Sequence, residues 1–174
     1  HLPYLILPGY EADDIIGTLM NWCSNADLEG VMVTSDKDYM QLITDKITLL
    51  NHNGDQVGKA GVFQKFGCTP DQVIEVLGLM GDSSDNIPGV KGVGEKTAIK
   101  LIQEFGSIPS VYENLANIKS VSLRKKLETD REAAFLSREL VTIFREVPLN
   151  IKLEDLKPSE MKLSDNVEFH QILE

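Results

Sequence analysis

Carboxylates fall in three short clusters along the first half of the chain. They are Glu11, Asp13, Asp14, Asp36, Asp38, Asp82 and Asp85. Like charges brought into one small volume repel one another unless cations neutralise them. Oxygen ligands without His or Cys suit hard Mg²⁺ or Mn²⁺ better than Zn²⁺. The three clusters together therefore predict a divalent-cation site.

Each cluster also has a purely structural interpretation. Asp and Glu at the start of a helix often cap it or complement its dipole, and this applies to the clusters at residues 11–14 and 36–38. In the polar stretch 81–86, an Asx-turn would explain Asp82 or Asp85 taken singly. The cation site is favoured because the clusters occur at three loop positions with few Lys or Arg residues nearby.

A glycine-rich turn at residues 87–94 runs directly into a helical pattern. Backbone N–H groups at a helix N-terminus bind phosphate, glycines permit close approach, and lysines add charge. This pattern is typical of a helix-hairpin-helix, which binds the DNA backbone without sequence preference. The predicted DNA-binding residues are Gly89, Val90, Lys91, Gly92, Val93, Gly94, Lys96, Thr97 and Lys100.

This turn has two other interpretations. A nucleotide-binding P-loop needs Gly-Lys-Thr contiguous after a strand, whereas here Glu95 separates Gly94 from Lys96 and a Pro-Gly turn precedes. A glycine-rich connection between two helices without any ligand stays open as the structural alternative.

The net charge of -10 and the sequence pI of about 4.8 seem to argue against nucleic-acid binding. The charge is unevenly distributed, however. Residues 1–85 carry 13 acids and 4 bases, residues 86–131 carry 5 acids and 8 bases, and residues 132–174 carry 9 acids and 5 bases. An acidic front and a basic middle are expected if one part binds cations and another meets an anion.

The elements that must position the acids alternate between strands and helices, as in α/β proteins. Apolar runs at Tyr4–Leu7 and Val31–Thr34 predict buried parallel strands, and the run Ile47–Leu50 predicts a further strand. Apolar residues at helical spacing between 15 and 23 predict a helix between the first two strands. A short helical stretch is expected through Met40 and Ile43. Ligands bind at the carboxyl ends of parallel strands, where the first two acidic clusters fall.

From Pro70 onward the apolar periodicity is almost wholly helical, including a segment from Ala133 to Ile143. We therefore predict an α/β core over residues 1–69 and a helical region over residues 70–174, together forming one compact unit. The two cysteines, Cys23 and Cys68, are interpreted as buried thiols. No apolar run reaches the roughly 18 residues of a membrane span, so a cytoplasmic location without membrane contact is expected.

The motifs Glu11-Ala-Asp-Asp14 and Thr34-Ser-Asp-Lys-Asp38, with the stretch from Leu79 to Ala98, resemble the 5′-nuclease domain of the bacterial DNA polymerase I family, within the flap-endonuclease superfamily. The resemblance covers essentially the whole chain. It implies a parallel-sheet, PIN-like nuclease core followed by a helix-hairpin-helix subdomain. The implied activity is metal-dependent hydrolysis of phosphodiesters at 5′ ends or flaps of duplex or branched DNA, in replication and repair.

The same resemblance implies roles for the residues. The seven acids would form a two-metal site, with Asp13, Asp14 and Asp36 as catalytic, direct metal contacts and the others acting partly through metal-bound water. The hairpin would hold duplex DNA and also K⁺ through backbone carbonyls. The implied partner is a polymerase domain of the same parent chain, in the nucleoid of a bacterial cytoplasm.

The chain also departs from the family pattern. The family begins with a strand that ends in a metal-binding Asp, followed by another such Asp and a helical arch, and these would precede His1. We therefore expect a fragment with impaired cleavage and an incomplete sheet that favours a homodimer. The rival interpretation is a non-catalytic DNA-binding module that uses its acids only as caps.

Overall fold

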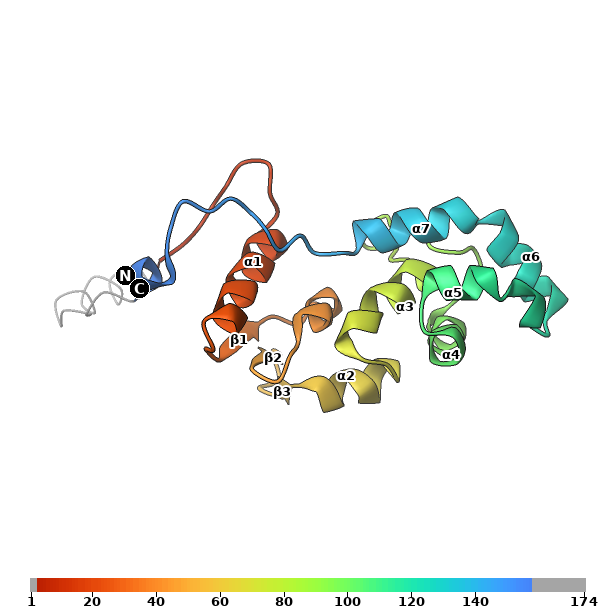
Figure 1. Ribbon diagram of the computed structural model, residues 1–174, viewed down its shortest axis with the longest axis horizontal. Coiled ribbons are helices and arrows are strands. Elements are labelled where there is room, and N and C mark those ends of the chain that lie inside the picture. Colours follow the sequence, from red (N-terminus) through yellow and green to blue (C-terminus); the bar gives the residue numbers. More distant parts are fainter. Residues whose placement is uncertain (1–2, 158–174) are drawn as a thin grey trace, which may run out of the picture.

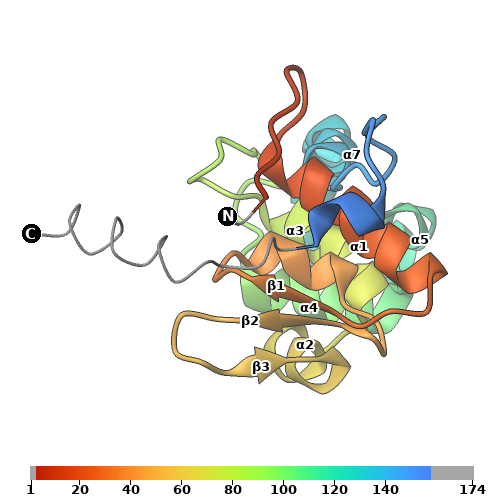
Figure 2. The same cartoon turned by 90° about the vertical axis from the view of Figure 1, so that its left-hand side faces the viewer.

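The computed structural model describes residues 3–157, in which a small sheet occupies the N-terminal half and helices the rest (Figure 1). The sheet has the order β1-β2-β3, formed by Gly30–Val33, Ile47–Leu50 and Gln56–Val57. β1 and β2 are parallel, with Gly30 opposite Ile47, and β3 pairs antiparallel with β2. Figure 2 shows helix α1 on one side of this sheet.

Helices make up most of the remaining structure. The α-helices are α1 Ala12–Asn25, α2 Lys59–Phe66, α3 Val73–Met80, α4 Glu95–Phe105, α5 Ile108–Glu113, α6 Val121–Thr129 and α7 Arg131–Leu140. The 3₁₀ helices are η1 Lys37–Leu42, η2 Pro70–Gln72, η3 Leu115–Asn117 and η4 Leu153–Leu156. α3 packs against α4, α5 and α7, because its sequence is apolar on nearly every face and must be buried all round.

An extended strap, residues 141–149, returns from α7 across α1 (Figure 1). The buried Gln41 side chain holds its start, donating from Nε2 to the Val141 carbonyl at 2.8 Å and accepting the Ile143 N–H at 3.0 Å. Further along, Val147 N–H donates to Thr18 Oγ1 at 3.0 Å. Gly17 permits the crossing, since a Cβ there would lie 2.7 Å from Ile143 Cγ2. The strap therefore joins the helical half to the α/β half.

One hydrophobic cluster runs through both halves of the molecule, from Met32 and Ile47 of the sheet to Leu127 and Ala134 of the last helices. The predicted boundary between residues 69 and 70 stays a prediction, and positions 1–2 and 158–174 of the two predicted regions lie outside the described residues. Within residues 3–157, no helix is long and apolar enough to cross a membrane.

Most predicted elements are present, but the strand expected at Tyr4–Leu7 is wrong. That segment is extended without strand pairing, and Tyr4 and Ile6 are 84% and 80% exposed. A strand requires a hydrogen-bonded neighbour, and β1 to β3 pair only with one another in the described part of the chain. β1 itself is confirmed as a parallel strand, although alternate residues, Val31 and Val33, face solvent.

Smaller differences have local causes. The last helix ends at Leu140 rather than continuing to Ile143, because the strap turns away to meet Gln41. The sequence does not predict β3 or α2. β3 has only two residues, and α2 buries only Val62 and Phe66, so neither element shows a clear apolar period. Cys68 is buried as expected, and Cys23 is half-buried on α1.

Candidate functional site

The first acidic cluster lies at the N-terminus of α1. Asp14 Oδ2 accepts the Glu11 backbone N–H at 3.3 Å, and Asp14 Oδ1 accepts the Phe144 N–H of the strap at 2.9 Å. Asp13 lies in the same first helical turn, where the dipole favours a negative charge. Asp14 therefore has a structural role, since it caps α1 and holds the strap.

An ion pair connects the second and third clusters. Asp36 caps η1, accepting the Asp38 N–H at 3.0 Å. Lys37 forms an ion pair with the buried Asp82, and this hydrogen bond lowers the pKa of the Asp82 carboxyl. Asp82 Oδ1 also accepts the Ser84 N–H at 2.8 Å, as in an Asx-turn. The loop 81–86 thus folds back onto the second cluster.

Asp38 lies where the charges of these clusters act together. Its Oδ1 is buried and has no hydrogen-bond partner among residues 3–157. Burial, and next the negative charge of Asp36, raise the pKa of Asp38 to about 6, and Asp82 and Asp85 add to this while Lys37 opposes it. The unpartnered oxygen marks a position where a cation would be stabilised.

The first cluster acts on the same region. Burial raises the pKa of Tyr39 to about 12, and the charges of Asp13, Asp36 and Asp14 contribute in that order. The charges of Asp13, Asp14 and Asp36 thus act on Tyr39, and those of Asp82 and Asp85 act on Asp38. Glu11 stands at the exposed start of α1.

The acids fit a hard divalent cation by their chemistry more than by their present spacing. All donors are carboxylate oxygens, and one is buried without a partner. Yet in the part of the chain that the structure describes, no three His, Cys, Asp or Glu side chains lie close enough together to hold one metal ion. The seven-acid metal site therefore stays a prediction.

The glycine turn connects α3 and α4 as a tight hairpin. Gly89 has a φ of +58° and lies so close to Gly81 that a Cβ would approach the Gly81 nitrogen to 2.4 Å. Its N–H donates to the buried Ser137 Oγ at 2.9 Å, and Val90 N–H donates to the Leu79 carbonyl at 2.8 Å. Val90 and Val93 are buried, so the hairpin is fixed to the helical core.

The outer side of the hairpin is open to solvent. Lys91, Gly92, Gly94, Lys96 and Lys100 are exposed. Gly94 precedes the first turn of α4, and nothing lies within 4 Å of the position its Cβ would take. An open helix N-terminus flanked by lysines suits a phosphate group.

Helix α6 adds basic residues that sequence reasoning missed. Lys126 Nζ donates to the Gly92 carbonyl at 3.1 Å, and Lys91 N–H donates to Asp130 Oδ2 at 2.8 Å. Between α6 and the hairpin is a cleft of about 270 Å³ lined by Lys91, Ser122, Lys125, Lys126, Thr129 and Asp130. The excess of basic residues over 86–131 indicates that this region carries positive charge. No sequence motif, however, connects Lys126 with Gly92.

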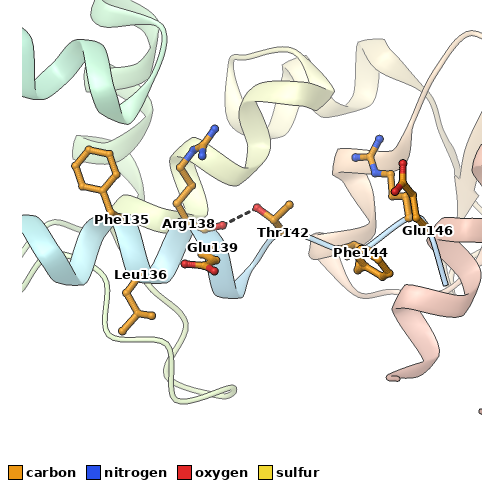
Figure 3. Close-up of a pocket in the computed structure, with 9 residues that line it drawn as sticks. Phe135, Leu136, Arg138, Glu139, Thr142, Phe144 and Glu146 are labelled. Atoms are coloured by element: carbon orange, nitrogen blue, oxygen red, sulfur yellow. Dashed lines mark hydrogen bonds between the residues drawn. The ribbon is translucent and has the colours of Figure 1, made fainter. Parts of the chain in front are cut away.

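A second feature that sequence reasoning missed is an aromatic pair beside the acids. The rings of Tyr10 and Phe144 are stacked, with centroids 6.1 Å apart and planes 18° apart. Phe144 also borders a groove of about 750 Å³ along α7 and the strap (Figure 3). The groove is lined by Phe135, Leu136, Arg138, Glu139, Thr142, Ile143, Phe144, Arg145 and Glu146.

Two family models match adjoining parts of the chain, from residue 1 to residue 164. Residues 1–67 match the model described as 5′-3′ exonuclease, N-terminal resolvase-like domain, and residues 68–164 match 5′-3′ exonuclease, C-terminal SAM fold. Among curated relatives, DNA polymerase I of Caldicellulosiruptor bescii is 44% identical over 168 residues, which cover 92% of this chain and 20% of the relative. DNA polymerase I of Bacillus subtilis is 43% identical, covering 87% of this chain and 18% of the relative. The chain thus spans about a fifth of the length of these relatives.

Solved structures show the same fold. The phage T5 5′-exonuclease with bound divalent zinc ions superposes with a TM-score of 0.74 at 24% identity, covering 82% of this chain and 53% of that one. The catalytic core of Rad2 in complex with DNA substrate superposes with a TM-score of 0.56 at 16% identity, covering 92% of this chain and 54% of that one. The predicted fold class, an α/β core followed by a helical region, is confirmed.

Proposed function

The chain belongs to the 5′-3′ exonuclease family, and from that membership we propose that it is the nuclease part of a bacterial DNA polymerase I. Its proposed reaction is hydrolysis of phosphodiesters at 5′ ends or flaps of duplex and branched DNA, in replication and repair. The observation that carries the proposal is Asp38, whose buried, unpartnered oxygen lies in the combined field of acids from separate loops.

The acids would hold divalent cations. In this proposal Asp13, Asp14 and Asp36 are the direct, catalytic ligands of Mg²⁺ or Mn²⁺, and Glu11, Asp38, Asp82 and Asp85 act partly through water. When bound, two such ions would supply an activated water and neutralise the scissile phosphate. The strap supports this role, because the Phe144 N–H fixes the orientation of the Asp14 carboxylate.

The basic residues of the hairpin and of α6 would hold the duplex. The hairpin from Gly89 to Thr97, with Lys100, contacts phosphates in this proposal, and Lys125 and Lys126 of α6 extend the contact. The proposal includes K⁺ at the hairpin carbonyls. Lys126 already donates to the Gly92 carbonyl, so K⁺ would have to share or replace that contact.

Three further parts of the proposal concern the chain as a whole. Cleavage by residues 1–174 alone is expected to be slow, because the described carboxylates do not gather around a single ion. The free edge of β1, with Val31 and Val33 exposed, would pair with a strand of a second copy in a homodimer. The other proposed partner is the polymerase domain of the parent chain, in the bacterial nucleoid.

A DNA-binding module without catalysis is the second candidate function. It is favoured by the structural roles that several acids already have, since Asp14 and Asp36 cap helices and Asp82 pairs with Lys37. In that case the hairpin would bind DNA, and the acids would bind no cation.

One experiment separates the two functions. The purified chain is titrated with a fluorescent 5′-flap duplex and, separately, with Mn²⁺ by calorimetry, and its nuclease activity is assayed with Mn²⁺ and with EDTA. The nuclease proposal predicts DNA binding, Mn²⁺ binding that Asp36→Asn weakens, and slow cleavage that EDTA abolishes. DNA binding without Mn²⁺ binding would instead identify the non-catalytic module, and failure to bind DNA would contradict both.

A further inference from the structure

We propose that Tyr10 and Phe144, with the adjoining groove, bind an unpaired nucleobase of the substrate strand next to the cleavage site. This inference rests on the proposed nuclease function. It assigns a base-binding subsite to two residues that neither the acidic clusters nor the hairpin includes.

The two aromatic side chains are more exposed than is usual for large apolar residues. Tyr10 and Phe144 are 36% and 46% exposed, although large aromatic side chains contribute most when they are buried. The two rings lie nearly parallel, and both residues stay partly exposed, so a third ring could stack on them. Flat, exposed aromatic rings are the surfaces on which proteins stack unpaired bases.

The position of the pair connects it to the acids. Tyr10 directly precedes Glu11, and the Phe144 N–H donates to Asp14 Oδ1 at 2.9 Å. Under the proposed function, cations at these acids would attract the scissile phosphate, and its nucleotide would then lie near both rings. The rings are also preorganised, since the backbone of Phe144 is tied to α1 and the strap is fixed by Gln41.

The groove beside Phe144 suits a base better than a phosphate. Its arginines have partners, because Arg138 Nε donates to Glu75 Oε1 at 2.8 Å and Arg145 donates to the Gln41 carbonyl at 2.9 Å. Glu139 and Glu146 are exposed and form no ion pair within residues 3–157. Carboxylates repel phosphate, whereas they accept hydrogen bonds from the amino groups of bases.

The groove also has apolar surface for the face of a base. Leu136 is exposed on α7, and Figure 3 shows it and Phe144 separated along the groove with Glu139 and Thr142 between them. A combination of apolar walls and a few polar groups is typical of a small-molecule site. The pair and the groove together therefore favour one flat, polar-edged ring system as the occupant.

The test uses the whole chain and a 5′-flap duplex that carries 2-aminopurine as the unpaired nucleotide at the junction, with Ca²⁺ present. Stacking on an aromatic ring quenches 2-aminopurine fluorescence. We expect quenching on binding, and about 10-fold weaker flap binding with loss of quenching in Tyr10→Leu and Phe144→Leu. Affinity for a blunt duplex without an unpaired base should not change.

Three controls make the result specific. Phe63→Leu alters an exposed aromatic residue on α2 and should leave quenching and affinity unchanged. Phe144→Trp should restore stacking that Phe144→Leu removes. The unaltered chain should bind a flap with an abasic site at the junction about 10-fold more weakly than the normal flap. This control does not depend on whether the leucine variants fold.

Several outcomes would overturn the inference. Binding of both DNAs without quenching would overturn the base-binding inference but not the proposed function. The same holds if the leucine variants lose equal affinity for the flap and the blunt duplex. Concentration-dependent dimerisation that Phe144→Leu abolishes would assign the pair to a second copy of the chain instead. Failure to bind either DNA would overturn this inference together with the proposed function.

Discussion

Asp38 illustrates how neighbours decide the chemistry of a single carboxyl group. Its buried Oδ1 has no hydrogen-bond partner in the described part of the chain, and its pKa is raised to about 6 by burial first and then by neighbouring carboxylates. A raised pKa means that the folded state binds the proton more tightly than the unfolded state. The folded protein therefore loses stability as the pH rises from about 4 through 6.

This predicts a pH-dependent effect of Asp38→Asn. Above pH 6 the variant should be more stable than the parent by about 1–2 kcal/mol, a figure reduced for the partial exposure of the group. Near pH 3.5 most of the difference should disappear, since Asp38 is then protonated in the folded state and mostly protonated in the unfolded state. Urea unfolding at both pH values measures this.

The matched control is Asp71→Asn, which alters a carboxylate in the first turn of η2. It should show no comparable gain at neutral pH. Mg²⁺ should stabilise the parent chain more than Asp38→Asn, because a cation would relieve the same repulsion. An equal gain from Asp38→Asn at both pH values would show that charge is not the cause.

At the scale of elements, the exposed surface of the hairpin and the first two acidic clusters lie on different elements, whereas the third cluster adjoins the hairpin, with Asp82 N–H donating to the Ile87 carbonyl at 3.0 Å. The hairpin is fixed by bonds of Gly89 and Val90 to Ser137 and Leu79, and its lysines are exposed. A change at its surface should therefore alter phosphate binding without altering cation binding.

Lys96→Gln tests this separation. Loss of one phosphate contact should weaken DNA binding and reduce the slope of log K against log salt concentration by about 1. Calorimetric binding of Mn²⁺ should stay unchanged. Lys65→Gln on α2 is the control and should preserve the slope, while parallel loss of DNA and Mn²⁺ binding by Lys96→Gln would contradict two separate sites.

The elements that could be predicted from sequence are those specified by local pattern. α1, β1 and β2 show apolar periodicity, and the hairpin shows glycines where positive φ and close approach are needed. The position of Tyr4–Leu7 could not be predicted in the same way. An apolar run shows a capacity to pair, but pairing also needs a neighbouring strand.

The candidate site was predictable in its residue types but not in its contacts. The acids could be identified because three clusters follow turns or strands. The Asp14–Phe144, Lys37–Asp82 and Lys126–Gly92 contacts join residues 130, 45 and 34 positions apart. Such long-range contacts depend on the tertiary fold and leave no periodic signal.

At the scale of the whole molecule, the strap makes the two halves depend on each other. Gln41 is buried in the α/β half and bonds both Val141 and Ile143, which follow the helical half. Removing its amide would leave buried backbone groups without partners, and each such group costs about 1–3 kcal/mol.

Gln41→Leu should therefore lower the free energy of unfolding by about 2–4 kcal/mol, as measured by urea denaturation. Hydrogen exchange should accelerate at Ile143, whose N–H loses its acceptor. The control is Gln103→Leu, which removes an exposed bond to the Gly67 carbonyl and should cost less than about 1 kcal/mol. Equal costs for the two variants would show that the strap does not couple the halves.

The strap also imposes an order on biosynthesis. The ribosome makes α1 early, yet the Asp14 acceptor of Phe144 N–H and the Thr18 acceptor of Val147 N–H gain their donors about 130 residues later. Contacts so distant along the chain form late during folding. The hairpin's own distant contact, from Gly89 N–H to Ser137 Oγ, uses a residue that is made slightly earlier, so we expect the acidic end to be the last part of the nascent chain to gain its contacts.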